Sequence, residues 1–302
     1  MPRFGSVITA MVTPFHADGS IDLDTAETLA RFLVSSGSDC LVLAGSTGEG
    51  SVLTDEERID LFRAVAGSVD VPVIASTGTN DTAHSVLMTE RAKAVGVDGI
   101  LAVTPYYNRP SPAGLSAHFR AIAQASDLPV LLYDIPIRSG RRIGAELTLE
   151  LARDVPTIVG VKDATGDVAA AAEVVAESPD GFEVYCGDDS LTLPFASIGA
   201  AGIISVAAHW AARPIGEMIS CYRSGDVEGA TRINQHLAES YRFESSDEYP
   251  NPVPAKAACR SLGLAVGQCR LPNAPAPTAL EDRAQAVMSR LNQNEPMHQT
   301  VV

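Results

Sequence analysis

Residues 157–177 read TIVGVKDATGDVAAAAEVVAE, and this stretch decides the fold. A short run rich in Val and Ile leads through a polar turn into an alanine-rich segment with helical periodicity, which is the pattern of one strand–helix unit of a parallel sheet. Units of the same kind recur along the chain. The expected strands are residues 5–13, 39–45, 71–76, 98–104, 129–134, 157–162, 182–187 and 202–207. The expected helices are residues 24–36, 55–67, 81–95, 112–125, 145–154, 167–177 and 190–199, with one more after residue 212.

Eight such units within about 225 residues predict an α/β fold, a closed (β/α)8 TIM barrel, although an open doubly wound sheet has similar alternation. From residue 226 the strand signal stops, and helical patterns continue to about residue 291. They are interrupted by Asn251-Pro252 and by the proline-rich segment 271–277. The sequence therefore predicts a catalytic barrel over 1–225, a C-terminal helical region over 226–291 and a disordered tail over 292–302.

The composition limits the possible partners and compartments. Lys plus Arg total 22 against 37 Asp plus Glu, and the net charge of −15 disfavours binding to nucleic acids or anionic membranes. Five dispersed cysteines without a CxxC pair fit reduced thiols in the cytoplasm. The uncharged stretch 190–212 is better explained by a helix followed by a buried strand than by a membrane span, and we find no targeting segment.

The chain has three lysines against nineteen arginines. Lys93 lies in an expected helix and Lys256 at an expected helix start, whereas Lys162 interrupts a strand and is the one lysine predicted to be buried. Burial favours the neutral amine, which is the form that attacks a ketone to give a Schiff base. Gly160, on the same strand face, would leave open space beside the amine. The alternative is a structural lysine paired with a carboxylate such as Asp163.

Other polar side chains follow the expected strands, where a barrel places its active site. Tyr133 ends a strand and can transfer a proton if a hydroxyl of Ser46, Thr47 or Tyr107 orients it; a structural tyrosine is the alternative. Arg138 follows the same strand and can bind a carboxylate through its planar guanidinium, unless it is an ordinary exposed arginine.

The sequence lacks the motifs of several cofactor sites. The loop over residues 45–50 has no GK[ST] ending, although its amides and hydroxyls could hold a carboxylate. The six histidines show no HExxH or HxxEH spacing, and no GxGxxG follows the first strand. We therefore predict neither a metal nor a dinucleotide cofactor.

Taken together, the motifs resemble the dihydrodipicolinate synthase family, within the N-acetylneuraminate lyase superfamily of pyruvate-dependent class I aldolases. The resemblance spans nearly the whole chain, and the order of the motifs is specific. They are VITAMVTPF at 7–15, GSTGE at 45–49, TPYYN at 104–108, YDIPIRSG at 133–140, GVKDATGD at 160–167, GDD at 187–189, GIISV at 202–206 and NPVPAK at 251–256.

The resemblance implies a role for each residue of a proton relay and a pyruvate site. Lys162 would form a Schiff base with pyruvate, and Thr47 with nearby amides would hold the pyruvate carboxylate. Tyr133 would be the general acid and base. Ser46 and Tyr107 would complete its proton relay, with Tyr107 supplied by the neighbouring subunit of a tight dimer.

The resemblance also implies a second substrate and an assembly. Arg138 would bind the carboxylate of L-aspartate 4-semialdehyde, Ile204 would present a backbone carbonyl near the Schiff base, and Gly187 would border the substrate. The product would be 4-hydroxy-tetrahydrodipicolinate, in lysine and diaminopimelate biosynthesis. The enzyme would be a homotetramer, a dimer of dimers, with no cofactor besides the covalently bound pyruvate.

Some positions depart from the family pattern. Ser46 replaces the usual Thr and gives the GSTGE form of sialic-acid lyases, whereas Tyr107 and Arg138 fit the synthases. Asp134 replaces a frequent Asn, and Asp163 a frequent Glu. The alternatives are an N-acetylneuraminate lyase, a 2-keto-3-deoxy sugar acid aldolase, or a non-catalytic barrel that binds a keto acid. The acidic segment over residues 244–248 has no explanation at this level.

Overall fold

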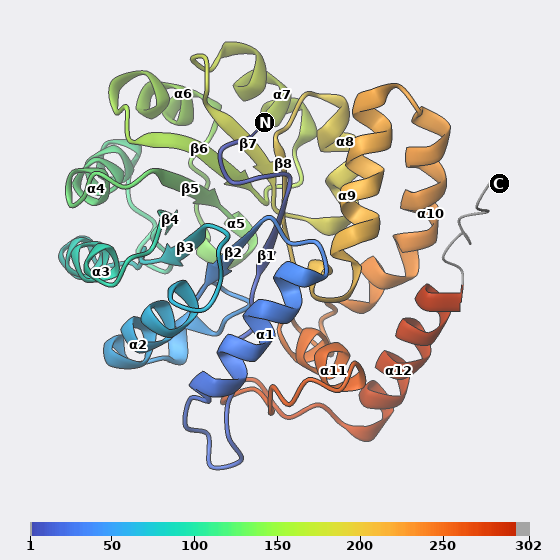
Figure 1. Cartoon of the computed structure of the whole chain (residues 1–302). Helices are drawn as coiled ribbons and strands as arrows, with labels where there is room; N and C mark the ends of the chain where they lie inside the picture. The colour runs from blue at the N-terminus through green and yellow to red at the C-terminus, as the bar shows by residue number, and fades with distance from the viewer. Residues whose placement is uncertain (1, 294–302) are drawn as a thin grey trace.

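The computed structural model describes residues 2–293, which form a closed barrel of eight parallel strands surrounded by helices (Figure 1). Each strand pairs with the next along the chain, and the last strand pairs with the first, with Ile8 opposite Ile204. The strands are β1 Val7–Ala10, β2 Cys40–Leu43, β3 Val73–Ser76, β4 Gly99–Val103, β5 Val130–Asp134, β6 Ile158–Asp163, β7 Glu183–Cys186 and β8 Gly202–Ser205. The predicted barrel is therefore confirmed, and the open sheet is excluded.

The helices alternate with the strands and then continue alone beyond β8. They are α1 Leu23–Ser35, α2 Asp55–Ala66, α3 Thr82–Ala94, α4 Pro112–Gln124, α5 Pro136–Ser139, α6 Ala145–Asp154, α7 Val168–Glu177, α8 Thr192–Ser197, α9 Ala208–Ser224, α10 Val227–Phe243, α11 Val253–Ser261 and α12 Thr278–Gln293. Two 3-10 turns, η1 Gly50–Val52 and η2 Asp189–Leu191, precede α2 and α8. The stretch 190–212 contains α8 and the buried β8, as predicted. None of the described helices is long and apolar enough to cross a membrane.

Two elements differ from the expectation. The first strand was expected over 5–13 but ends at Ala10, and the chain then passes over the barrel rim, where the amide of Phe15 donates to the carbonyl of Val266. Helix α5 was not expected at all. It has one turn and begins at Pro136, so it is too short to show a helical period in the sequence.

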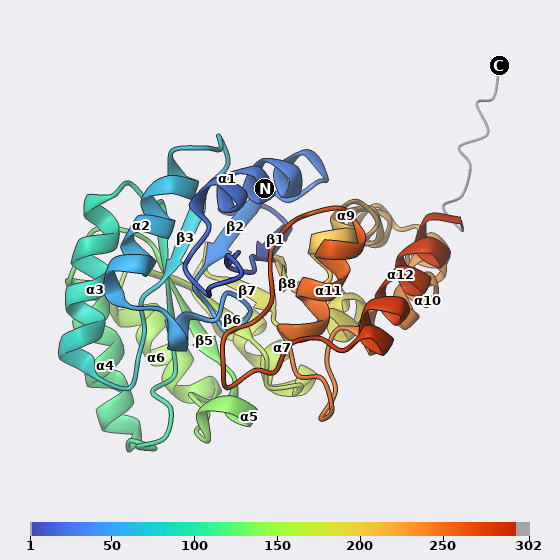
Figure 2. The ribbon, with the colours of Figure 1, turned by 90° about the horizontal axis from the view of Figure 1, so that it is seen from below.

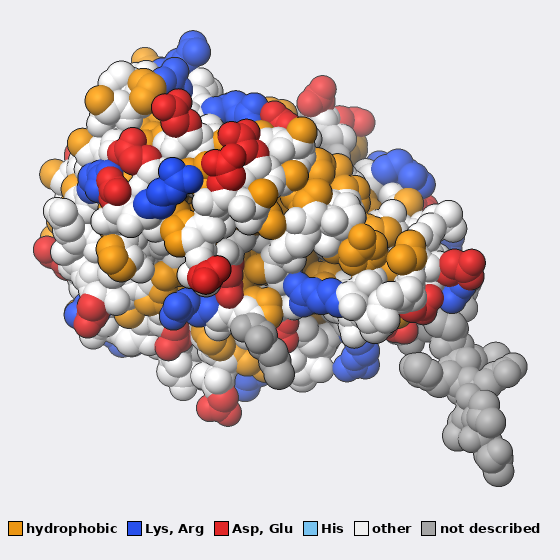
Figure 3. Space-filling view, turned by 90° about the horizontal axis from the view of Figure 1, so that it is seen from above, with side chains coloured by type: hydrophobic (Ala, Val, Ile, Leu, Met, Phe, Trp, Pro, Cys, Tyr) orange, Lys and Arg blue, Asp and Glu red, His pale blue; other side chains and the backbone are white. Residues whose placement is uncertain are grey.

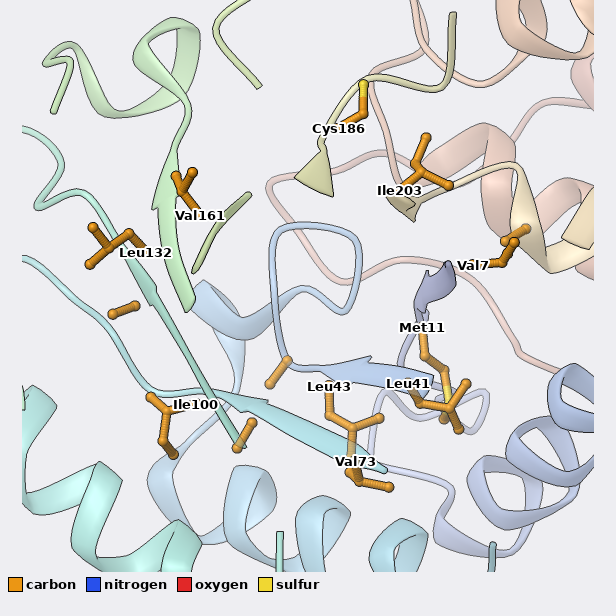
Figure 4. Close-up of a cluster of buried hydrophobic side chains, with 14 of the residues drawn as sticks. Val7, Met11, Leu41, Leu43, Val73, Ile100, Leu132, Val161, Cys186 and Ile203 are labelled. Carbon is orange, nitrogen blue, oxygen red and sulfur yellow. The ribbon is translucent and has the colours of Figure 1, made fainter. Parts of the chain in front are cut away.

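The strands separate two apolar layers. Leu132 and Val161 point outward into the layer beneath the helices (Figure 4). Side chains in a strand alternate between its two faces, so the neighbouring residue Tyr133 belongs to the second cluster, which fills the barrel interior together with Tyr185 and Ile204. The alternation therefore places Tyr133 and its register partner Lys162 inside the barrel, whereas Asp134 and Asp163, which end the two strands, lie on the outer face.

Helices α10, α11 and α12 lie together on one side of the barrel (Figures 1 and 2), where α10 and α11 pack against α9. The indole nitrogen of Trp210 in α9 donates to Ser240 Oγ in α10 at 2.5 Å. Helix α12 extends to Gln293, and residues 294–302 of the predicted tail lie outside the described residues. The division into a barrel and a helical region near residue 225 stays a prediction.

Figure 3 shows charges of both signs spread over one face of the molecule.

Candidate active site

A cavity of about 450 Å³ opens at the carboxyl ends of β2 to β5, between the barrel and the C-terminal region. Three residues predicted for the site line it, namely Ser46, Tyr133 and Arg138. Asn251 and Asn273, from the segments that flank α11, close its other side. The cavity therefore lies where a barrel enzyme carries its chemistry.

Lys162 is not among the residues that line this cavity, but it lies beside Tyr133, which does line it. The two residues are register partners on β6 and β5, and the lysine Nζ is 4.6 Å from the centre of the tyrosine ring. Both side chains are buried, with exposed fractions of 6% and 5%. Asp163 does not pair with the lysine; its Oδ1 accepts from the amide and hydroxyl of Thr165 at 2.8 and 2.7 Å. No ion pair of Lys162 is found among the described residues, so the structural alternative loses its proposed partner.

The space around Lys162 differs from the prediction made from Gly160. A Cβ atom at Gly160 would lie 2.3 Å from the carbonyl oxygen of Glu183 and 2.9 Å from Leu131 Cδ2, so this glycine allows close strand packing and opens no space. The expectation of open space there was wrong. The glycine that lies next to the end of the Lys162 side chain is Gly187, because a Cβ atom on it would be 3.1 Å from Lys162 Cε.

The two candidate carboxylate-binding residues are joined through Asn251, which we did not single out from the sequence. Asn251 Nδ2 donates to the hydroxyl of the buried Thr47 at 2.9 Å. Its backbone carbonyl accepts from the Arg138 guanidinium at 3.3 Å. The signal was available, because Asn251 opens the NPVPAK motif, but its partners lie 113 and 204 positions away in the chain.

Tyr107 is not brought to Tyr133 within the chain. Its side chain is 91% exposed at φ +73°, and the neighbouring Tyr106 lines the cavity instead. Ile137, also after a strand, is 90% exposed. The expected relay of Ser46, Tyr133 and Tyr107 is therefore incomplete in a single chain.

Lys256 is fully buried, so the prediction that Lys162 alone is buried was wrong. Its Nζ lies 2.7 Å from Glu49 Oε1, 3.0 Å from the carbonyl oxygen of Gln268 and 4.1 Å from the ring centre of Phe15. Burial lowers the pKa of Lys256, and the Glu49 carboxylate opposes this shift. A buried lysine is tolerated here because a carboxylate from the GSTGE loop accompanies it.

We expect Lys256→Met to lower the free energy of unfolding by about 3–5 kcal/mol, because Glu49 would keep a buried charge without its cation. Denaturant unfolding of the two chains measures the change. Lys93→Met is the matched control, since the Lys93 ammonium pairs with Asp127 on the surface at 2.6 Å, and such pairs contribute about 1 kcal/mol or less. Equal small losses in both variants would contradict the prediction.

Asp134 and Asp163, two of the departures from the family pattern, are register partners on β5 and β6. Burial raises the pKa of Asp134 to about 6, and burial also raises the pKa of Asp163. Asp134 Oδ2 accepts from the amides of Ile143 and Gly144 at 3.0 and 3.4 Å. Asp134 thus holds residues 143–144, in the segment that follows α5, by two hydrogen bonds.

We compared the sequence with protein-family models and with proteins of known name. The model of the Dihydrodipicolinate synthetase family matches residues 3–293. The chain belongs to this family. The 4-hydroxy-tetrahydrodipicolinate synthase of Moorella thermoacetica is 49% identical, over 89% of this chain and 92% of that protein. The synthase of Bacillus subtilis is 44% identical, over 90% and 94%.

Solved structures of the family have the same fold. The dihydrodipicolinate synthase of Bacillus anthracis is 41% identical with a TM-score of 0.92, over 98% of this chain and 100% of that one. The enzyme of Cyanidioschyzon merolae, solved with lysine bound, is 40% identical with a TM-score of 0.94, over 97% and 99%. The resemblance inferred from the motifs is confirmed.

Proposed function

We propose that the chain is a 4-hydroxy-tetrahydrodipicolinate synthase, a lyase that condenses pyruvate with L-aspartate 4-semialdehyde through a Schiff base on Lys162. The observation that carries the proposal is the buried Lys162 amine over the ring of Tyr133, a residue that lines the cavity together with Arg138. The names of the relatives, at 42–49% identity, support this choice of substrates. The covalent pyruvate takes the place of a cofactor.

In the first half-reaction the Lys162 amine attacks the pyruvate ketone, and the carbinolamine loses water to give an iminium. Thr47 holds the pyruvate carboxylate through its hydroxyl, whose orientation is fixed by the bond from Asn251 Nδ2. Loss of a C3 proton then gives the enamine. Tyr133, in contact with the amine, carries protons between these intermediates.

In the second half-reaction the enamine carbon attacks the aldehyde of L-aspartate 4-semialdehyde, and the new alkoxide takes a proton. The amino group of this substrate then attacks the iminium carbon, which closes the ring and releases Lys162 as a free amine. Arg138 binds the carboxylate of the aldehyde substrate. Its guanidinium faces the cavity, and its contact with the Asn251 carbonyl leaves donors for a ligand.

We expect Arg138→Ala to raise the KM for L-aspartate 4-semialdehyde by about 10- to 100-fold and to change the KM for pyruvate much less. The lost contact is a charge-assisted hydrogen bond to one substrate, worth roughly 1.5–3 kcal/mol. Steady-state kinetics with each substrate varied in turn measure both constants. Arg142→Ala is the control, because Arg142 pairs with Asp167 on the surface at 3.2 Å. Equal effects on both substrates would argue against this role.

A substrate panel separates the synthase from the alternatives. We expect turnover with L-aspartate 4-semialdehyde and little with N-acetylneuraminate or 2-keto-3-deoxygluconate. Ser46, in the GSTGE form of sialic-acid lyases, favours the second candidate, a lyase of the same superfamily, and preference for either sugar acid would establish it. Pyruvate binding without turnover of any aldehyde would indicate a non-catalytic barrel.

The proposal includes a cytoplasmic homotetramer built as a dimer of dimers. Tyr107 and Ile137 support it, since both large side chains are about 90% exposed beside the cavity mouth and available to a second copy. Tyr107 from the partner subunit would complete the relay of Ser46 and Tyr133. Sedimentation of the active chain tests the assembly, and a strictly monomeric active enzyme would remove this role.

A further inference from the structure

The turn after β7 forms a wall against the Lys162 side chain. A Cβ atom on Gly187 would lie 3.1 Å from Lys162 Cε and 2.7 Å from Ala164 Cβ, so the turn and the lysine are in close contact. The thiol of Cys186 donates to the carbonyl oxygen of Asp188 at 3.0 Å, which fixes the start of the turn. A shift of this turn would change the position of the amine.

Asp189, the last residue of the turn, ties it to β8. Its side chain is 1% exposed, Oδ1 accepts from the hydroxyl of Ser205, and Oδ2 accepts from the amide of Val206 at 2.8 Å. Donors therefore approach both carboxylate oxygens. Burial raises the pKa of Asp189, but these hydrogen bonds favour its ionised form and oppose the shift.

Helix α10 packs against η2, and Glu244 at the C-terminal end of α10 lies close enough to Asp189 for each carboxyl group to change the pKa of the other. Its Oε2 is buried, and no donor reaches it among the described residues. Two carboxyl groups in contact away from water cannot both be ionised. Because donors reach both oxygens of Asp189 and none in the described part of the chain reaches Glu244 Oε2, a proton on Glu244 that is donated to Asp189 would satisfy both groups.

The charges around Glu244 agree with this assignment. Burial raises its pKa well above the ordinary value, the charges of Asp189 and Asp188 raise it further, and the charge of Lys162 opposes the shift. The hydroxyl of Tyr241, one turn earlier on α10, is also buried without a partner in the described part of the chain. It lies close enough to Asp189 and Glu244 for their charges to raise its own pKa.

We propose that Glu244, as a neutral acid that donates to Asp189, is a positioning residue that holds the turn 187–189 against the Schiff-base lysine. The proposal rests on the proposed role of Lys162. It also explains the first residue of the acidic segment 244–248, whereas residues 245–248 are exposed. Through this bond the C-terminal helical region contributes to the barrel's chemistry without touching the substrate.

The test compares Glu244→Ala with Glu244→Gln in the full-length enzyme. We expect the alanine variant to form the borohydride-trapped pyruvate adduct roughly 10- to 100-fold more slowly, as for other lost supporting hydrogen bonds, with the KM for L-aspartate 4-semialdehyde within about threefold of the original. The glutamine variant keeps a neutral donor of the same length and should retain the adduct rate and the pH profile within about threefold. Glu248→Ala, in the exposed part of the same segment, is the control.

The outcomes separate the possible roles of Glu244. An alanine variant that forms the adduct at the original rate would overturn the positioning role, and a glutamine variant as slow as alanine would show that an ionised carboxylate is needed. If the alanine variant does not fold, the adduct rate and pH profile of the glutamine variant still decide whether Glu244 acts as a neutral donor. Absence of any adduct in the unaltered enzyme would instead refute the Schiff-base function itself.

Discussion

Replacement of Lys162 by Arg should reduce turnover by more than roughly 10³-fold while the chain still folds. A guanidinium stays protonated at any working pH and cannot attack a ketone, whereas it keeps the positive charge and much of the length of the lysine. Lys162 Nζ lies over the Tyr133 ring, 4.6 Å from the ring centre, and a guanidinium can stack on the same ring face. Measurement of kcat, together with circular dichroism, separates loss of chemistry from loss of folding.

The same residue should be identified chemically. Borohydride added with pyruvate reduces the imine and should leave a pyruvate-derived adduct on the peptide that contains Lys162. Lys93→Arg is the control and should keep both turnover and the adduct, since Lys93 pairs with Asp127 on the surface. An adduct that maps to Lys93 or Lys256, or the absence of any adduct, would rule out the proposed mechanism.

The barrel could be predicted from the sequence because most strands are apolar runs and several of the longer helices, such as α1 and α6, have one clearly apolar face. The run at 157–162 corresponds to β6, and the alanine-rich segment after it corresponds to α7. Short elements escaped the prediction. Helix α5, with four residues, has no period to detect, and β1 stops before its apolar run ends because the chain leaves the sheet at the rim.

The cavity was predicted in part. Tyr133 lies near the end of β5, and Ser46 and Arg138 lie in the segments just after β2 and β5, so the alternation of strands and helices was enough to predict that they meet at one rim. Asn251 and Glu244 could not be found in this way. Their partners in the barrel are fixed by the docking of the C-terminal helices, and the sequence contains no periodic signal for that docking.

The burial of the lysines also shows that contacts between distant parts of the chain cannot be predicted from local sequence patterns. Lys162 was expected to be buried because it interrupts an apolar strand, and it is buried in the structure. Lys256 lies in a helix whose buried residues include both its neighbours, Ala255 and Ala257, so the usual inference that a lysine marks the exposed face of a helix fails here. Its partner Glu49 is 207 positions earlier in the chain, so only the three-dimensional fold reveals the pair.

Tyr133→Phe should lower kcat by about 10²- to 10⁴-fold, because it removes the proposed proton carrier and keeps the ring that packs in the barrel interior. The hydroxyl of Thr104 donates to the backbone carbonyl of Tyr133, a contact that phenylalanine preserves, so the free energy of unfolding should change little. Lys162 keeps its amine, so borohydride should still trap the pyruvate adduct, although more slowly.

Tyr185→Phe provides a matched control for this loss. Tyr185 is also buried in the barrel interior and is the register partner of Lys162 on β7, on the opposite side from Tyr133. Its hydroxyl donates to Glu183 at 2.7 Å, at the start of the strand and away from the cavity, so its removal should leave kcat within a few-fold of the original. Equal losses in the two variants would mean that barrel packing, and not proton transfer by Tyr133, limits turnover. A Tyr133→Phe enzyme with full kcat would show that another group moves the protons. The contrast between two tyrosines that flank one lysine therefore tests the proton transfer that we propose for the Tyr133 phenol.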